Sequence, residues 1–297
     1  MATLLFRVRP AAVVDVVGPD REAFLQGQVT SDVRRLADAG TPALPTAGLS
    51  PKGKLIFVAR LTAPGDRLRL VLPSALRETV LAHLKKYAVF QKVSLEDRTE
   101  DFARIGIRGE APDPLEGEIP MGPDGEFDDD RLVPAASREG FVRALEARGG
   151  RLLPPDEAEV LRVEAGRPRF GHDFDGSNLP DEVGLDDAIS TSKGCYVGQE
   201  IVARMRTYGR INRRIVGFHF PDGGIPAGAR LERPASPPAR AEPGRVTTSV
   251  VSDRFGAIGL GWAFHDVPIG AELVSEGAPP RRAVLAGLPF AFAPASA

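Results

Sequence analysis

The sequence predicts an α+β protein that ends in a small antiparallel β-barrel. Between residues 55 and 108 the predicted elements follow the order strand, strand, helix, strand, which favours an open antiparallel sheet with a helix on one face. From residue 213 onward, short β-rich runs alternate with Pro/Gly turns and no helix is predicted, which is typical of a barrel. The candidate barrel strands are residues 215–220, 246–251, 257–264 and 284–288.

Caps and periodicity assign the elements before the barrel. Residues 1–17 are apolar but interrupted by charges, and they are predicted to form a first strand rather than a signal peptide. A helix is expected to begin at Asp20 and to end near Gly27, and a second helix is expected from Ser74. Further helices are predicted over residues 137–148 and 155–164, with a Pro-, Gly- and Asp-rich surface loop over residues 110–130.

The composition is that of an ordinary globular protein. A length of 297 residues allows about one to three domains. Because the net charge is −2, the chain has no overall positive field to attract nucleic acid, and no cationic tail suggests a membrane surface. No apolar run is long enough to span a bilayer. We therefore expect neither nucleic acid nor a membrane as a partner.

Cys195 is the only cysteine of the chain. It cannot form an intramolecular disulfide, which fits a reducing compartment, and we expect a cytoplasmic protein. One thiolate also cannot hold an iron–sulfur cluster alone, since such clusters usually take four. The four histidines are scattered without metal-ligand spacing, so no metal site is predicted.

The segment 191–200 is the strongest candidate site. Lys193 stands two residues before Cys195, and a helix is predicted from Gln199, with Gly209 as its C-terminal cap. A lysine and a helix N-terminus both favour a thiolate and lower its pKa below the free value of about 8.5. A lone cysteine is equally often a small buried side chain. From position alone, a reactive thiol and a core residue are therefore equally supported.

The run Lys193-Gly194-Cys195-Tyr196-Val197-Gly198-Gln199-Glu200 resembles the signature of the YgfZ-type folate-binding proteins. That family belongs to the superfamily of the glycine-cleavage T-protein, a folate-dependent aminomethyltransferase. The segment 20–33, which includes Asp32, is similar to the opening of that superfamily, and three more of its motifs follow in order. These motifs are Arg162-Val163-Glu164-Ala165-Gly166, Gly171-His172-Asp173 and Pro180-Asp181-Glu182-Val183-Gly184-Leu185.

The resemblance implies a T-protein-like fold, with two interleaved α+β domains and a C-terminal barrel set around a central folate cavity. The first domain is expected to comprise residues 1–47 and 100–188, and the second residues 48–99 and 189–210. The barrel domain is expected to comprise residues 211–297.

The resemblance also implies a site. The composition of the turn that contains Lys52 predicts a solvated hairpin tip, but the resemblance implies that this turn lies beside the folate cavity. A pterin ring presents an amino group and a ring N–H side by side, which a carboxylate accepts together. We expect Glu164, held by Arg162, to be that carboxylate, and Lys52 and Lys193 to contact the carboxylates of the folate tail. The remaining expected cofactor-binding residues are Asp32, Tyr196 and Gln199.

The expected function is that of a tetrahydrofolate-binding protein in the assembly or repair of iron–sulfur clusters. Its partners would be a reduced folate and client or assembly proteins, with Cys195 acting as a redox or ligand thiolate beside Lys193. Two alternatives stay open, a folate-dependent aminomethyltransferase and a non-catalytic folate-binding module. Aminomethyltransferases carry an essential aspartate after the first hairpin, whereas residues 41–65 contain no Asp or Glu. That absence disfavours the transferase.

Overall fold

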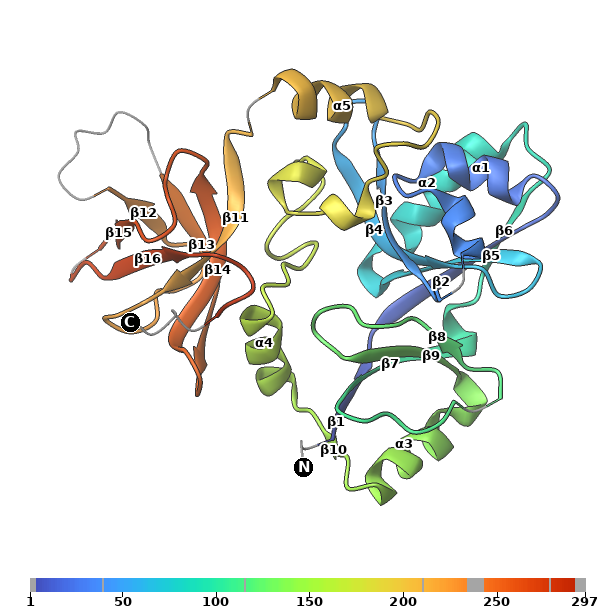
Figure 1. Cartoon of the computed structure of the whole chain (residues 1–297), viewed down its shortest axis with the longest axis horizontal. Coiled ribbons are helices and arrows are strands. Elements are labelled where there is room, and N and C mark those ends of the chain that lie inside the picture. Colours follow the sequence, from blue (N-terminus) through green and yellow to red (C-terminus); the bar gives the residue numbers. More distant parts are fainter. Residues whose placement is uncertain are drawn as a thin grey trace. The chain divides into compact units, whose positions relative to one another are not determined.

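The computed structural model describes residues 4–38, 40–114, 116–209, 211–233, 243–277 and 279–291. The chain divides into two compact units (Figure 1). Unit 1 comprises Met1–Pro154 and Leu185–Ala203, and unit 2 comprises Pro155–Gly184 and Arg204–Ala297. The helix α5 (Gln199–Tyr208) begins in unit 1 and ends in unit 2.

Unit 1 contains two five-stranded sheets. The first has the strand order β3-β4-β5-β2-β6, and every neighbouring pair is antiparallel. The strand β2 lies between β5 and β6, and five of its seven residues are buried. The helix α2 (Arg77–Ala88) packs on β2, β4 and β6 through its buried residues Val80, His83 and Leu84. The strands are β2 (Ala11–Val17), β3 (Leu44–Leu49), β4 (Leu55–Thr62), β5 (Arg67–Pro73) and β6 (Ser94–Asp97).

The second sheet of unit 1 has the order β10-β1-β7-β9-β8, in which only β1 and β10 run parallel. The helix α3 (Arg138–Ala147) covers this sheet. Phe141 and Leu145 of α3 pack against Phe6 and Ile105 of the sheet, so apolar residues at helical spacing meet the alternating residues of the strands. The strands are β1 (Leu5–Arg9), β7 (Phe102–Arg108), β8 (Ile119–Pro120), β9 (Asp129–Pro134) and β10 (Arg151–Leu152).

Pro10 divides what the sequence predicts to be a single first strand. β1 ends at Arg9 and joins the second sheet, whereas β2 begins at Ala11 and joins the first. Because proline has no N–H to donate to a neighbouring strand, pairing is interrupted at this position and the chain passes from one sheet to the other.

Two further sequence predictions need correction. The sheet predicted over residues 55–108 is wrong in its last strand, because β7 pairs with β1 and β9. The loop predicted over residues 110–130 contains β8 and the start of β9. The strands β2 and β3 share a sheet with β4 and β5. The domain boundaries themselves stay a prediction.

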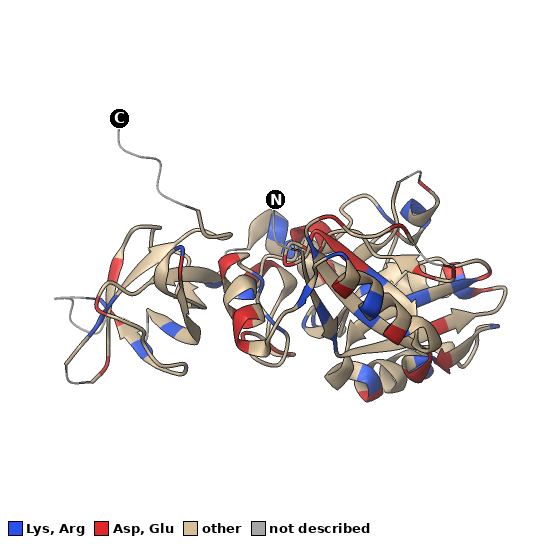
Figure 2. Cartoon of the chain, turned by 90° about the horizontal axis from the view of Figure 1, so that it is seen from below, with Lys and Arg blue, Asp and Glu red and all other residues tan. Residues whose placement is uncertain are grey.

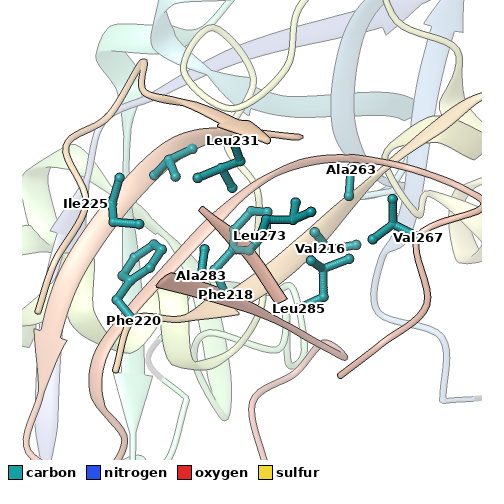
Figure 3. Packing of buried hydrophobic residues seen from close by; sticks show 11 residues of the cluster. Val216, Phe218, Phe220, Ile225, Leu231, Ala263, Val267, Leu273, Ala283 and Leu285 are labelled. Carbon is teal, nitrogen blue, oxygen red and sulfur yellow. The ribbon is translucent and has the colours of Figure 1, made fainter. Parts of the chain in front are cut away.

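Unit 2 contains the helix α4 (Pro155–Glu164) and a closed barrel of the order β11-β14-β13-β12-β15-β16. Its core is formed by inward-facing apolar residues such as Val216, Phe218 and Leu285 (Figure 3). The structure confirms the α+β fold class and the barrel. The two strands that the sequence did not reveal, β12 and β15, are short. The barrel strands are β11 (Arg213–His219), β12 (Arg230–Glu232), β13 (Gly244–Ser252), β14 (Gly256–Phe264), β15 (Glu272–Ser275) and β16 (Arg282–Ala286).

The remaining elements are short. The helix α1 (Arg21–Gln28) follows β2, as the sequence predicts. The short 3-10 turns are Val33–Ala37, Ser74–Leu76, Thr99–Asp101, Ala135–Ser137, Pro180–Glu182 and Asp186–Ala188. Acidic and basic residues are interspersed within each unit (Figure 2). Within the described ranges, no helix is both long enough and apolar enough to cross a bilayer.

Candidate functional site

The segment that follows α1 connects two parts of unit 1. Thr30 is fully buried and pairs with Ala47 of β3 on one side, where its N–H donates to the Ala47 carbonyl at 2.9 Å. On its other side the Thr30 hydroxyl donates to the carbonyl of Ala188 at 2.6 Å, and the Thr30 carbonyl accepts from the N–H of Ser190 at 3.0 Å. The segment before the signature run is therefore attached to the N-terminal part of the chain by way of Thr30.

Lys193 completes this attachment. Its side chain is buried, and Nζ donates to the carbonyl oxygens of Gln26, Val29 and Ser31 at 2.7, 2.7 and 2.8 Å. Burial lowers the pKa of Lys193 to about 8, although the nearby Asp32 carboxylate acts in the opposite direction. An ammonium group has three donors, and all three are used. Lys193 thus has no donor left for a folate carboxylate, which corrects the expected contact with the folate tail, whereas its effect on the Cys195 thiolate stays a prediction.

Cys195 is exposed on the loop that Lys193 anchors. On its N-terminal side lies the buried Lys193, and on its C-terminal side lies Tyr196, which is 8% exposed and has its ring centroid 5.1 Å from Lys193 Nζ. The N–H of Val197 donates to the carbonyl of Gly27 at 3.1 Å. An exposed thiol between buried neighbours is not a core residue, so the alternative of a small buried side chain is excluded.

The signature run also packs directly on the Lys52 turn. A Cβ placed on Gly198 would lie 2.6 Å from the carbonyl oxygen of Ser50 and 3.3 Å from Cα of Gly53. Gly198 has φ +84°, which side chains disfavour. The turn is closed by the Ser50 N–H, which donates to the Lys54 carbonyl at 2.8 Å, and Lys52 is exposed at its tip. Two candidate segments nearly 150 residues apart in sequence therefore lie side by side.

Tyr196 and Gln199 fasten the loop to the first turn of α5. The N–H of Tyr196 donates to Oε1 of Gln199 at 3.3 Å, and the N–H of Gln199 donates to the Tyr196 carbonyl at 3.2 Å. The helix begins at Gln199, and the N–H of Gly209 donates to the Met205 carbonyl at 3.0 Å, as predicted for a C-terminal cap. These contacts give both residues a structural role, and their expected folate contacts stay predictions.

Asp32 caps the 3-10 turn Val33–Ala37. Its carboxylate accepts from the backbone N–H of Arg34 at 3.2 Å, from the Arg34 guanidinium, and from Nε2 of Gln26 at 2.9 Å. The hydrogen bond from the Arg34 side chain is the main reason that the pKa of Asp32 is held well below its usual range. Asp32 therefore stays charged and fixes the chain around the carbonyls that bind Lys193. A contact between Asp32 and a cofactor stays a prediction.

Arg162 and Glu164 belong to unit 2. The sequence suggested that Arg162 holds the Glu164 carboxylate, but the two side chains have different partners. Each residue turns an α-helix by about 100°, so residues two apart point in nearly opposite directions. Arg162 is buried and binds Glu159 at 2.6 Å, Asp173 at 2.7 Å and the Thr248 hydroxyl at 3.1 Å. The expectation that Arg162 holds Glu164 is wrong.

Glu164 faces the barrel instead. Its Oε1 accepts from the Ser252 hydroxyl at 2.6 Å, and its Oε2 lies 3.4 Å from Nη1 of Arg254. The side chain is 7% exposed. Each oxygen already has one donor, and a carboxylate oxygen has capacity for another. Its role as the pterin acceptor stays a prediction.

Asp173 is the residue whose importance the sequence did not reveal, since it was noted only as part of a family motif. It accepts from Arg162, from the hydroxyls of Thr247 and Thr248, and from the N–H of Arg169. Burial alone would raise the pKa of Asp173, but the Arg162 charge and the two hydroxyls outweigh burial and lower it. The signal available beforehand was the order of the family motifs, since Arg162 and Asp173 belong to two of them and form an ion pair. No cluster of three or more His, Cys, Asp or Glu side chains that could bind a metal ion occurs in the part of the chain that the structure describes.

The comparisons with known proteins define the class and then the family. No model of a protein family matches the chain. Among solved structures, the glycine cleavage system aminomethyltransferase T from Bartonella henselae is similar with a TM-score of 0.83, over 98% of this chain and 87% of that one. At 16% identity this likeness shows the fold alone, so the chain has the aminomethyltransferase T fold.

Sequence relatives are more specific. The tRNA-modifying protein YgfZ of Pectobacterium atrosepticum is 32% identical over 238 residues, which cover 72% of this chain and 70% of the relative. The protein of the same name from Cronobacter sakazakii is 31% identical over 226 residues, which cover 69% of this chain and 67% of the relative. The chain belongs to the YgfZ family, as its signature run predicts.

Proposed function

We propose that this protein binds a reduced folate, tetrahydrofolate, and acts in the assembly or repair of iron–sulfur clusters in client enzymes. The observation that carries the proposal is the exposed Cys195 on a loop whose neighbouring residues are buried and hydrogen-bonded. Such a loop holds its thiol at one place on the surface, where a second protein has access to it.

The thiol requires a partner to be useful. One thiolate serves as a single ligand of a cluster shared between two proteins, or it attacks a disulfide of the client to form a mixed disulfide and release a client thiolate. Both steps take place on an exposed sulfur. The Lys52 turn lies beside the same loop, so a partner that reaches Cys195 also meets an exposed cation.

Folate binding is supported by the family and by Glu164. The family is folate-associated, and Glu164 is a buried carboxylate with unused acceptor capacity. Transfer of an aminomethyl group is not part of the proposal, because residues 41–65, which include β4, contain no acidic residue. The folate would therefore be bound without that reaction.

The name of the relatives connects the proposal to tRNA modification. With a net charge of −2, the chain has no overall positive field to attract the phosphate backbone. We therefore propose that the link to tRNA modification lies in the client proteins. The first candidate clients are enzymes that modify tRNA and contain an iron–sulfur cluster.

Calorimetry with tetrahydrofolate under anaerobic conditions tests the folate half of the proposal. Glu164→Gln should weaken binding by about 1.5–3 kcal/mol, the usual contribution of a hydrogen bond to a charged group. Glu276→Gln, an exposed glutamate of the same unit, serves as the matched control and should bind like the wild type. Equal affinity in wild type and Glu164→Gln would remove Glu164 from the site, and no binding to the wild type would refute folate binding.

Complementation tests the cluster half. Cells that lack the protein should lose activity of cluster-dependent tRNA-modifying enzymes, most severely under oxidative stress. Cys195→Ser should fail to restore that activity while keeping its folate affinity, whereas Glu164→Gln should fail because it loses folate. Full activity in the null cells under oxidative stress would leave the folate-binding module as the better description.

A further inference from the structure

A cavity of about 510 Å³ lies wholly within unit 2, between the segment 171–178 and the barrel. Its barrel side is formed by the start of β11, the start of β13 and the end of β14. Ala263, Val216 and Val246 point into the barrel core, so their neighbours in sequence Trp262 and Arg245 point outward. The volume lies within the range of roughly 300–1,000 Å³ that is usual for small-molecule sites.

Two arginines flank one indole on this face. Arg245 of β13 is directly opposite Trp262 of β14 in the strand register, so the two side chains share a face. On the other side Ile215 of β11 is opposite Trp262, and Arg213, two residues earlier, lies on the same face. The guanidinium carbon of Arg213 is 4.8 Å from the centroid of the Trp262 ring.

Arg213 and Trp262 are held in place. The indole N–H of Trp262 donates to the carbonyl of Asp173 at 2.9 Å, and Nε of Arg213 lies 3.4 Å from Oε1 of Glu182. The terminal Nη1 and Nη2 of Arg213 have no acceptor in the described part of the chain. A guanidinium that is stacked and held through Nε presents its terminal N–H groups in a fixed geometry, which suits a carboxylate.

A carboxylate lines the same cavity. Asp173 is already neutralised by Arg162 at 2.7 Å, but Asp175 is exposed and accepts only from Ser177, whose N–H donates at 2.7 Å. The Ser177 hydrogen bonds are the main cause of the lowered pKa of Asp175, and the charge of Arg213 lowers it further. Arg213 therefore attracts Asp175, yet no ion pair joins the two among the described residues. Arg213 and Asp175 thus line the same cavity without forming an ion pair with each other in the described part of the chain.

We propose that this cavity binds a small zwitterion carrying a carboxylate and an ammonium group, as a free α-amino acid does. The ligand's carboxylate accepts from the terminal nitrogens of Arg213, and its ammonium group donates to Asp175. A simple anion would lack a partner for Asp175, and a simple cation would lack one for Arg213, so the two-charge ligand matches the lining best. This inference does not depend on the proposed function.

The test uses the fact that Trp262 is the only tryptophan of the chain. Its intrinsic fluorescence in the full-length protein therefore reports this cavity directly. Titration with L-alanine, L-glutamate and L-lysine should give a saturable change for at least one of them. The two half-ligands, propionate and ethylamine, should bind at least tenfold more weakly than that amino acid.

Two variants separate the charges. Asp175→Asn should weaken binding of the amino acid at least tenfold and leave the affinity for propionate unchanged. Arg213→Gln should weaken the binding of both ligands. Arg282→Gln, an exposed arginine of the barrel that pairs with Asp222, is the matched control and should leave every titration unchanged. Circular dichroism and thermal unfolding confirm that each variant is folded, and Arg213→Lys, which keeps the charge, should restore part of the binding.

Three results would overturn the proposal. The first is no saturable response of the wild type to any of the amino acids. The second is propionate binding as tightly as the amino acid, which would make the cavity a plain anion site. The third is an Asp175→Asn variant, folded like the wild type, that binds the amino acid with unchanged affinity.

Discussion

The ammonium nitrogen of Lys193 lies 2.7 Å from the carbonyl oxygen of Val29, although the two residues are 164 positions apart in the chain. This contact, with those to Gln26 and Ser31, replaces the hydrogen bonds that three backbone carbonyls would otherwise make with water. The lysine of the signature run is thus a structural anchor, whereas Cys195 two residues later is exposed.

Removal of the Lys193 ammonium group should destabilise unit 1. Lys193→Met keeps the length of the side chain but leaves buried carbonyls without a donor, and we expect a loss of about 3 kcal/mol in the free energy of unfolding. Urea unfolding measures it. Lys52→Met, at an exposed position, is the control and should change the free energy by less than about 0.5 kcal/mol. Equal stability of the two variants would show that the three carbonyls are solvated.

A side chain at position 198 should displace the signature loop from the Lys52 turn. Gly198→Ala places a Cβ 2.6 Å from the Ser50 carbonyl oxygen at a backbone φ of +84°, and the expected cost is about 1–3 kcal/mol. Gly194 lies on the same loop, and a Cβ there meets no atom within 4 Å. Gly194→Ala should therefore be nearly neutral in the same thermal unfolding experiment. If both variants unfold at the same temperature, the close packing of Gly198 is not a determinant of stability.

The network around Asp173 should be sensitive to loss of its cation. Arg162→Met leaves Asp173 buried without its charged partner, which should cost about 3–5 kcal/mol. Arg169 also binds Glu159 but is 46% exposed, so Arg169→Met should cost no more than about 1 kcal/mol. Unfolding in guanidinium chloride measures the free energy of unfolding of both variants. A small effect of Arg162→Met would indicate that water replaces the guanidinium.

His83 should make stability depend on pH. It is buried between Phe57 and Tyr87, with ring centroids 6.0 and 5.2 Å away, and burial together with the charge of Lys86 lowers its pKa below the usual value. At a pH below about 6.5 the unfolded chain therefore takes up a proton that the folded chain does not. The free energy of unfolding should fall as the pH drops through this range.

The His83→Phe variant isolates this effect, because phenylalanine keeps the aromatic packing and does not titrate. The difference in unfolding free energy between wild type and variant, measured by urea denaturation at a series of pH values, should grow in favour of the variant on acidification. An NMR titration of the His83 ring should give a midpoint below about 6.5. A midpoint above that value would contradict the assignment.

Local patterns in the sequence determined much of this protein. The helices that begin at residues 21 and 155, the strand Phe102–Arg108 and four of the six barrel strands follow from caps, alternation and Pro/Gly turns, which act over a few neighbouring residues. The unbroken run from Lys193 to Glu200 was enough to indicate the family. These features are short-range, so a single sequence contains them.

Only the tertiary structure decided which segments meet. The sequence placed Lys193 beside Cys195, yet the fold turns its ammonium group toward carbonyls some 165 residues away, because a buried charge is stable only where acceptors surround it. Likewise Arg162 turns from Glu164 toward Asp173, and Pro10 sends adjacent strands into different sheets. Contacts of this kind form because buried donors and acceptors need hydrogen-bond partners, which residues distant in sequence supply. The spacing of residues along the chain does not reveal which residues these are.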